Sequence, residues 1–478
     1  MSTCLVTTTI PYVNARPHVG FALELVQADV IARWHRQKGD DTYFLTGTDE
    51  NAIKNVVVAK EQGLTPRELC DRNATVFEDL LRKLCISSDA FIRTSSETHH
   101  AGARKFWNAC SGDIATQRYR GKYCVGCEDF YFERDVVDGK CPIHFQTPQD
   151  VEEQNHFFQL SRYQDVVKDA IDSSVYRVGP DTRRNEALAF AERGLQDFSI
   201  SRSIARSDGW GVRVPDDDTQ TLYVWFDALT NYLNGVGYAD ETEKFAHYWE
   251  TADRIIPVCG KDVLKFHALY WPAMLASAGL RLPTDLHVHG FLTVDGRKIS
   301  KSVGNAVDPF PIIEQYGPDA LRYYLLRHVP SGEDSDFSHE RFAEVYESDL
   351  ANGLGNLVSR LEALCVRAGL DRLTTDLTES PVVDLEDRRF NRALETLWET
   401  VRDINRDIES RRPWEYLAYG GPEDLKRILA EWISKILCFA HGVSPFLPGT
   451  ASEIMRRFSA DSISRGTSLF PRIRQHNQ

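Results

Sequence analysis

The amino-acid sequence predicts an α/β protein: a parallel-sheet domain that is split by a metal-binding insertion and followed by an all-α domain. Three observations predict this order. Strand and helix patterns alternate near the beginning of the chain and again after about residue 254, a paired cysteine–histidine motif lies between them, and every apolar pattern beyond about residue 340 has a helical period. The 478 residues are enough for roughly three domains.

The first hundred residues carry a strand–helix–strand pattern. Residues 4–10 are apolar and β-branched, as expected of a buried strand. Residues 20–37 place Leu23 and Val26 at helical spacing, and residues 42–45 form a second short apolar run. A β-α-β unit of this kind predicts a parallel sheet.

The insertion contains two pairs of metal-ligand residues. The chain reads Cys-Val-Gly-Cys, then thirteen residues, then Cys-Pro-Ile-His. The alternative is four unrelated residues, because a free cysteine is often only a small buried hydrophobe. The two-residue spacers favour one structural zinc ion in a closed tetrahedral site, which would leave the chemistry to other residues. The predicted ligands are Cys124, Cys127, Cys141 and His144.

The second half of the sheet follows the insertion, and a helical domain follows the sheet. Residues 254–259 predict a buried strand, residues 263–278 a helix and residues 286–294 another strand. Past Glu340, leucines from Leu350 to Leu361 share one helical face, and apolar residues 394–408 share another. We expect halves of the sheet domain at 1–113 and 215–295, the insertion at 114–214, a loop-containing connection at 296–345 and a helical domain at 346–478.

Composition and charge narrow the class of protein. Hydrophobic residues make up 42% and charged residues 26%, as is usual for globular proteins. A net charge of −14 argues against coating DNA by long-range attraction, although it permits an RNA of defined shape that is contacted by local basic patches. The chain has no basic leader and no apolar run near the roughly 18 residues of a membrane span, so we expect a cytoplasmic protein with reduced cysteines and no membrane contact.

Polar loops follow four of the predicted strands. Ligands of open α/β sheets bind beyond the carboxyl ends of the strands, so these loops predict one cleft. The loops are residues 11–20, 46–50, 260–262 and 298–302.

Several of these loops carry a family resemblance. His18-Val19-Gly20 before a helix, with Lys298-Ile299-Ser300-Lys301-Ser302 about 280 residues later, resembles the paired signature of class I aminoacyl-tRNA synthetases. The zinc motif, residues 260–262 and residues 223–228 are similar to the methionyl-tRNA synthetases in particular, and the similarity covers nearly the whole chain. The resemblance implies a Rossmann-like catalytic domain, a helical anticodon-binding domain, ATP-dependent activation of L-methionine and its transfer to tRNA(Met).

The resemblance also assigns roles to residues. It implies that His18, Lys298 and Lys301 are catalytic, and that Asp49 holds the methionine ammonium beside an aromatic slot that suits a polarizable thioether. On periodicity alone these aromatics would be core residues. ATP, with Mg²⁺, would contact His18, Gly20, Gly260, Lys261, Asp262, His289, Gly290, Lys298 and Lys301. Methionine would contact Ile10, Tyr12, Asp49, Trp225, Ala228, Leu229, Tyr232, Phe266, His267 and Trp271.

The helical domain would read the anticodon. Unpaired bases stack on aromatic rings and bond to polar side chains, although a tryptophan after a helix-starting proline can also be buried. The implied residues are Asn352, Asn356, Arg360, Pro413 and Trp414.

Two positions depart from the family signature. Phe21 stands where the signature normally ends in a second histidine, and Asn51 replaces a histidine in the segment that begins Thr48-Asp49-Glu50. Two further hypotheses follow: a paralogue that activates methionine but passes it to an acceptor other than tRNA, or a weakly catalytic sensor of methionine or tRNA. The anticodon positions argue against the first and the lysine loop against the second. We expect a monomer.

Overall fold

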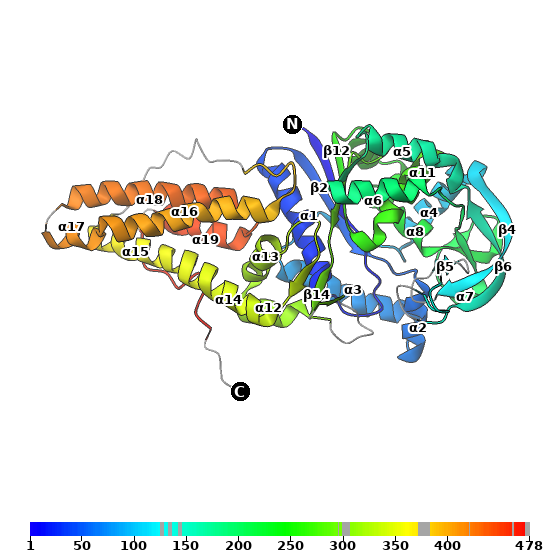
Figure 1. Cartoon of the computed structure of the whole chain (residues 1–478), viewed down its shortest axis with the longest axis horizontal. Coiled ribbons are helices and arrows are strands. Elements are labelled where there is room, and N and C mark those ends of the chain that lie inside the picture. The colour runs from blue at the N-terminus through cyan, green and yellow to red at the C-terminus, as the bar shows by residue number, and fades with distance from the viewer. Residues whose placement is uncertain are drawn as a thin grey trace. The chain divides into compact units, whose positions relative to one another are not determined.

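The computed structural model describes residues 1–124, 129–131, 136–141, 146–294, 296–298, 306–370, 383–419, 421–460 and 463–473. The chain divides into two compact units (Figure 1). The first unit comprises Met1–Pro17, Asp40–Asp79 and Ser88–His289. The second comprises His18–Gly39, Leu80–Ser87 and Gly290–Gln478.

A six-stranded parallel sheet forms the centre of the first unit, as the alternating pattern predicts. The strand order is β3-β2-β1-β12-β13-β7, so strands from the two halves of the sequence lie side by side, with Val6 in register with Ile256. The order reverses between β1 and β12, and ligand sites of such sheets lie at this point. The strands are β1 (Thr3–Thr8), β2 (Asp41–Thr48), β3 (Ala90–Arg93), β7 (Arg177–Gly179), β12 (Arg254–Gly260) and β13 (Asp285–His289).

The expected insertion contains smaller antiparallel sheets and also one strand of the central sheet. β7 lies within residues 114–214 but pairs with β13, and both Arg177 and Arg254 donate to the buried carboxylate of Asp285, at 2.8 and 3.1 Å. The sequence signal did not predict β7. The other strands are β4 (Ile114–Cys124), β5 (Asp129–Tyr131), β6 (Gln149–Phe158) and β8 (Phe198–Ser199) in one sheet, and β9 (Ser201–Ser203), β10 (Arg213–Val214) and β11 (Asp217–Leu222) in another.

Helices connect these strands, including α4 between β3 and β4 and the short α8 and α9 before β12. Figure 1 shows α4, α5, α6, α8 and α11 in this unit. The α-helices are α2 (Ile53–Glu61), α3 (Pro66–Lys83), α4 (Glu97–Ala109), α5 (Gln164–Asp172), α6 (Asp181–Glu192), α7 (Ile204–Ser207), α8 (Val224–Leu229), α9 (Asn231–Asn234), α10 (Glu243–Phe245) and α11 (Trp271–Ser277). Residues 246–250 are π-helical.

Two predicted elements are divided in the structure. The helix expected at 263–278 consists of a 3₁₀ turn at Lys261–Val263, a π-helical segment at Phe266–Tyr270 and α11. Pro272 lies in the first turn of α11, and a proline has no amide to continue the hydrogen-bond ladder of a preceding helix. The strand expected at 286–294 ends at His289, and β14 (Leu292–Val294) joins another sheet with β15 (Arg297–Lys298) and β16 (Ser335–Phe337).

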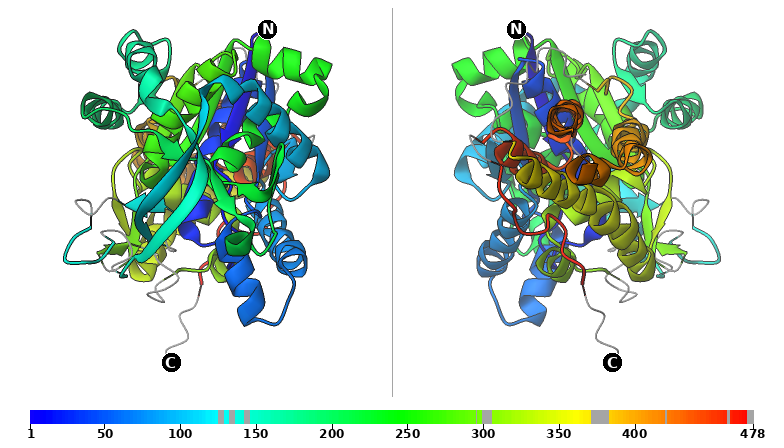
Figure 2. Two further views of the ribbon diagram at one scale, coloured as in Figure 1. Left: turned by 90° about the vertical axis from the view of Figure 1, so that its right-hand side faces the viewer. Right: turned by 90° about the vertical axis from the view of Figure 1, so that its left-hand side faces the viewer.

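Long helices form most of the second unit, which confirms the expected helical domain. The predicted faces from Leu350 to Leu361 and from Leu394 to Ile408 are buried. Figure 2 shows the long carboxyl-terminal helices packed side by side. The helices are α1 (Val19–Gln37), α12 (Pro309–Tyr316), α13 (Pro318–Arg327), α14 (His339–Val345), the π-helical η8 (Tyr346–Gly355), α15 (Asn356–Ala368), α16 (Phe390–Arg411), α17 (Pro413–Tyr419), α18 (Pro422–Val443) and α19 (Pro448–Phe458). None of the helices in the described ranges combines the length and apolar character needed to cross a bilayer.

A buried arginine on α13 joins three other segments of the second unit. The fully buried Arg322 lies 2.8 Å from the carboxylate of Asp29 on α1. Its remaining N–H groups donate to the carbonyls of Phe446, Pro445 and Leu84, at 2.7, 3.0 and 3.2 Å. Burial alone would raise the pKa of Asp29, but the guanidinium groups of Arg322 and Arg33 hold it below its usual value.

Replacing this arginine tests its structural role. Arg322→Met should lower the free energy of unfolding by about 3–5 kcal/mol, because it leaves a buried carboxylate without its main counter-ion. Urea denaturation measures the change. Arg341→Met is the matched control, since Arg341 forms an exposed pair with Glu344 and should cost less than about 1 kcal/mol. Equal losses for the two variants would contradict the role of Arg322.

Candidate active site

Three consecutive buried polar residues follow β2. Asp49, Glu50 and Asn51 are 2%, 0% and 8% exposed. Asp49 forms a parallel bridge with Tyr12, and its amide donates to the carbonyl of Pro11 at 2.9 Å. The loops that follow β1 and β2 are therefore held together at the carboxyl ends of adjacent strands.

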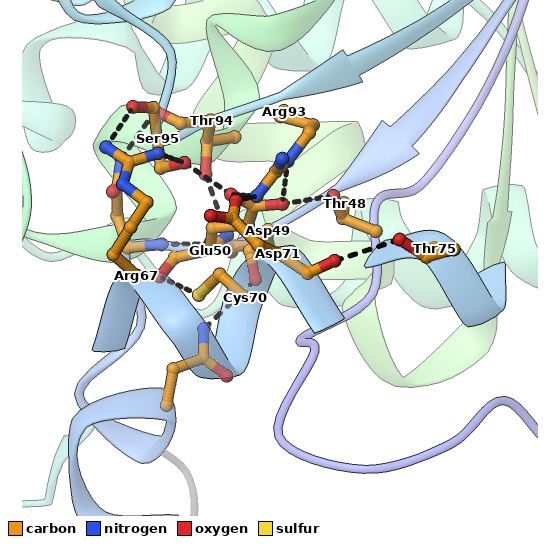
Figure 3. Close-up of polar contacts among 12 residues, drawn as sticks. Thr48, Asp49, Glu50, Arg67, Cys70, Asp71, Thr75, Arg93, Thr94 and Ser95 are labelled. Carbon is orange, nitrogen blue, oxygen red and sulfur yellow. Dashed lines mark hydrogen bonds and ion pairs between the residues drawn. The ribbon is translucent and has the colours of Figure 1, made fainter. Parts of the chain in front are cut away.

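Glu50 is fully engaged by protein donors (Figure 3). Arg93 donates to both carboxylate oxygens, from Nε at 2.6 Å and from Nη2 at 3.0 Å. The hydroxyl of Thr48 donates at 2.9 Å, and that of Ser95 donates to the second oxygen. A carboxylate with this many donors is a structural anchor for the loop.

A cysteine beside this anchor is not a nucleophile. Burial and the nearby charge of Glu50 raise the pKa of the Cys70 thiol to about 12. The thiol therefore stays protonated at neutral pH and donates to the carbonyl of Glu50 at 3.7 Å.

Asn51 joins the same loop to Thr94 and to α8, and through α8 to a histidine of α4. Its Nδ2 donates to the carbonyl of Thr94 at 2.9 Å and to Oδ2 of Asp227, on α8, at 2.7 Å. The other oxygen of Asp227 accepts from Nε2 of His99, on α4, at 2.7 Å. Both Asp227 and His99 are 1% exposed, so these bonds lie in the protein interior.

The predicted aromatic slot is a packed cluster in the first unit. The rings of Trp225 and Phe266 are stacked, with centroids 3.9 Å apart. Nδ1 of His267 donates to the carbonyl of Val263 at 3.0 Å, so its Nε2 accepts from the hydroxyl of Tyr232 at 2.8 Å. Six of the predicted residues are buried: Ala228, Leu229, Tyr232, Phe266, His267 and Trp271.

Ile10, Tyr12 and Trp225 are partly buried. Tyr12 and Trp225 both pack against a small buried cluster that contains Ala52. The carboxylate loop and the aromatic cluster thus share neighbouring side chains.

The predicted nucleotide residues of the first unit lie close together. Gly260 ends β12 in register with His289 at the end of β13. A Cβ on Gly260 would lie 2.8 Å from Oδ1 of Asp262 and 3.4 Å from the ring of His289. A side chain at position 260 would displace the carboxylate of Asp262, and Lys261 begins the following 3₁₀ turn.

The other predicted nucleotide residues belong to the second unit. His18 caps α1, and its Nδ1 accepts from the amide of Gly20 at 3.1 Å, so the neutral ring carries its proton on Nε2. Phe21, in the first turn, is 8% exposed. Gly290 is required by packing, because a Cβ there would lie 2.0 Å from the carbonyl of Glu333. The Lys298 side chain and Lys301 lie outside the described residues.

Half of the predicted zinc ligands can be placed. Cys124 and Cys141 are 2% and 0% exposed. Cys124 pairs with Asp129 across a hairpin, and the amide of Cys141 donates to the carbonyl of Gln146 at 2.9 Å. Cys127 and His144 lie outside the described residues, and the described ones contain no group of three or more side chains suited to bind a metal.

The predicted anticodon residues lie on α15, η8 and α17. Asn352 and Asn356 are exposed, Arg360 pairs with Glu409 at 2.6 Å, and Asn352 accepts from Arg472 at 2.8 Å. Pro413, at the start of α17, is buried. The side chain of Trp414 is 40% exposed, so it is not a core residue.

Sequence reasoning missed several residues of this network. It did not identify Arg93 or His99, and it did not assign Asp227 a role. The available signal was weak: Asp227 follows Trp225 by two residues, and His99 begins a pair of histidines in a helix. Only the tertiary structure shows that they converge on residues 49–51.

Comparisons with known proteins show the family to which this chain belongs. The family described as "tRNA synthetases class I (M)" matches residues 4–150 and 135–362. A methionine–tRNA ligase of Thermotoga maritima is 39% identical over 476 residues, covering 95% of this chain and 75% of the relative. A methionine–tRNA ligase of Brucella melitensis is 38% identical over 482 residues, covering 96% and 92%.

A solved structure also matches over its whole length. The Mycobacterium tuberculosis methionyl-tRNA synthetase in complex with methionyl-adenylate has a TM-score of 0.90 and 36% identity, with 99% of this chain and 100% of that chain covered. These matches define a class I aminoacyl-tRNA ligase. Within that class, the chain belongs to the methionine–tRNA ligase family.

The bond between Tyr232 and His267 can be tested by removing one hydroxyl. Tyr232→Phe should lower the free energy of unfolding by about 1–3 kcal/mol, because it leaves the buried Nε2 of His267 without its donor. Chemical denaturation measures this. Tyr316→Phe is the control, since the described residues offer its hydroxyl no hydrogen-bond partner, and it should change stability by less than about 0.5 kcal/mol. If Tyr232→Phe leaves the free energy of unfolding unchanged, the bond does not contribute to stability.

Proposed function

We propose that this chain activates L-methionine with ATP to methionyl adenylate and transfers the methionyl group to tRNA(Met). One observation carries the proposal: a buried carboxylate loop and an aromatic cluster share neighbours at the carboxyl ends of a parallel sheet. The family match and the relative bound to methionyl-adenylate support the same substrate.

For the amino acid, Asp49 accepts the ammonium group. Glu50 cannot do so, because Arg93 and Ser95 already occupy its oxygens. The thioether packs against aromatic rings, where a polarizable sulfur gains about 0.3–1.5 kcal/mol per contact. The partly buried Trp225, which packs against the same small cluster as Tyr12, would provide such a contact.

For the nucleotide, protein groups orient ATP and stabilise charge. The methionine carboxylate attacks the α-phosphorus of ATP, an α-phosphorus–oxygen bond forms, and pyrophosphate leaves. His18 donates from Nε2 to a phosphate oxygen, and Lys298 and Lys301 neutralise the leaving pyrophosphate together with the Mg²⁺ that accompanies ATP. A hydroxyl of the terminal ribose of tRNA then attacks the methionyl carbonyl, and AMP leaves.

For tRNA recognition, the anticodon bases stack on Trp414 and bond to Asn352, Asn356 and Arg360. The exposure of Trp414 and of the two asparagines supports this role. A buried tryptophan could not stack on a base without unfolding its surroundings.

For the insertion, we propose one structural zinc ion bound by Cys124, Cys127, Cys141 and His144. The hairpin at Cys124 and the backbone bond from Cys141 to Gln146 each enclose a four-residue connection that contains the second ligand of its pair. Two ligand pairs with two-residue spacers suit a tetrahedral ion. When bound, zinc would cross-link the two turns.

Two assays on the purified chain test the proposal. ATP–pyrophosphate exchange that depends on methionine would show activation, and charging of tRNA(Met) would show transfer. Exchange without charging would favour an acceptor other than tRNA, and the absence of both would favour a sensor. Phe21→His, run in parallel, shows whether a second histidine changes the rate.

Removing the exposed tryptophan should separate the two steps. Trp414→Ala should lower kcat/KM for charging about tenfold to a hundredfold, because base–aromatic stacking contributes about 1–3 kcal/mol per base. Exchange should stay within about twofold of the unmodified chain, because stacking on an anticodon base has no part in the activation step. Val366→Ala, at a second exposed apolar position in the helical domain, is the control. Equal losses in both assays would show that Trp414 supports the fold.

Zinc removal should affect transfer more than activation. Treatment with a chelator should release about one zinc per chain and lower charging, with a smaller change in KM for methionine, because the ion organises the insertion rather than Asp49. Metal analysis and the two assays measure this. The Cys141→Ser variant should reproduce the effect, and full charging by metal-free protein would contradict it.

A further inference from the structure

We propose that Asn51, acting through Asp227, sets the position of the Asp49 carboxylate relative to the aromatic cluster and thereby helps to determine selectivity for methionine. Asn51 is a positioning residue in this proposal, since it acts through Asp49 and α8 rather than on the substrate. The inference rests on the proposed function, because it concerns the site that binds the amino acid.

Asn51 contacts both parts of that site. Its amide donates to Oδ1 of Asp49 at 3.3 Å, which fixes the carboxylate against its own loop. Its side chain reaches Oδ2 of Asp227 at 2.7 Å, and Asp227 lies on α8 between Trp225 and Ala228. One residue therefore connects the group proposed to hold the ammonium with the helix that carries the side-chain pocket.

The connection is restrained because its donors are buried and each has an acceptor. Asn234 donates from Nδ2 to Nδ1 of His99 at 3.2 Å, which places the His99 proton on Nε2, where it bonds to Asp227. Nδ2 of Asn51 also donates to the carbonyl of Thr94 at 2.9 Å, so its two hydrogens have separate acceptors. Displacing this amide would remove a donor from a carboxylate that is 1% exposed.

A fixed distance between Asp49 and α8 would affect which amino acids fit the site. An amino acid held at its ammonium by Asp49 presents its side chain at a distance set by its own bonds, so the pocket must lie at a matching distance. If the loop and α8 move independently, side chains of other lengths fit nearly as well as methionine. An amide also has no proton to lose or gain near neutral pH, so the connection keeps the same charge.

Kinetics of the unmodified chain and Asn51 variants test the proposal. Asn51→Ala should raise KM for methionine in ATP–pyrophosphate exchange about tenfold to a hundredfold, while KM for ATP changes less than threefold. The ratio of kcat/KM for methionine to that for norleucine should fall. Asn51→His keeps an N–H donor and should recover part of the loss.

Two further variants separate positioning from folding. Asn155→Ala removes an equally buried amide from β6 and should leave both KM values within threefold. When KM for methionine is expressed as a free energy, the combined variant Asp227→Asn with Asn51→Ala should change it by less than the sum of the two single variants. Both changes remove the same connection. If Asn51→Ala does not fold, Asn51→Ser, which retains a smaller donor, replaces it in the same assays.

The outcomes distinguish this inference from the proposed function. The inference is overturned if a folded Asn51 variant keeps KM for methionine and the norleucine ratio within threefold of the unmodified chain, or if KM for ATP rises equally. The proposed function fails if the unmodified chain shows no methionine-dependent exchange. In that case calorimetric binding of methionine and norleucine to the same variants tests the inference directly, and equal relative affinities across them would overturn it.

Discussion

The pairing of β1 with β12 is the constraint on which the rest of the first unit depends. It joins two stretches of chain separated by the whole insertion, and the strand order reverses at this pair. The loops after β1, β2 and β12 therefore begin from neighbouring strand ends. Asp49 and Tyr12 form their bridge there, and Gly260 meets His289 there. Without this pairing the polar loops would be unrelated segments.

Several polar groups in the interior of this unit are paired with one another. Glu50 is neutralised by Arg93, Cys70 is kept protonated, and Asp227 is shared between Asn51 and His99. Buried charges require such partners, because desolvation is costly. Glu50, Cys70 and Asp227 are thus held by neighbouring protein groups. In the second unit, Arg322 likewise gives a buried charge its partner, because it binds Asp29 and three backbone carbonyls.

The two positions proposed to depart from the family signature are accommodated by the structure in different ways. Phe21 lies in the first turn of α1 and is 8% exposed, so its apolar ring is accommodated by burial. Asn51 instead makes three hydrogen bonds through its amide groups, to Asp49, Thr94 and Asp227. An apolar residue in place of a histidine removes an ionisable donor, whereas an amide keeps a donor that does not ionise.

The sequence by itself determined the class of fold, the order of its parts and the family. Hydrophobic periodicity is local, so β1, α1 and β2 could be predicted within a few residues, and so could the helical character of the chain beyond residue 340. The order of the motifs along the chain was enough to show the family resemblance, because this order can be seen without coordinates. Only the tertiary structure shows that residues 263–278 and 286–294 each form more than one element and that β7 belongs to the central sheet. Only the tertiary structure shows that Arg93, His99 and Asp227 lie at the loop of residues 49–51. Such contacts join residues tens to hundreds of positions apart, and they depend on burial and strand order, which no local pattern in the chain records.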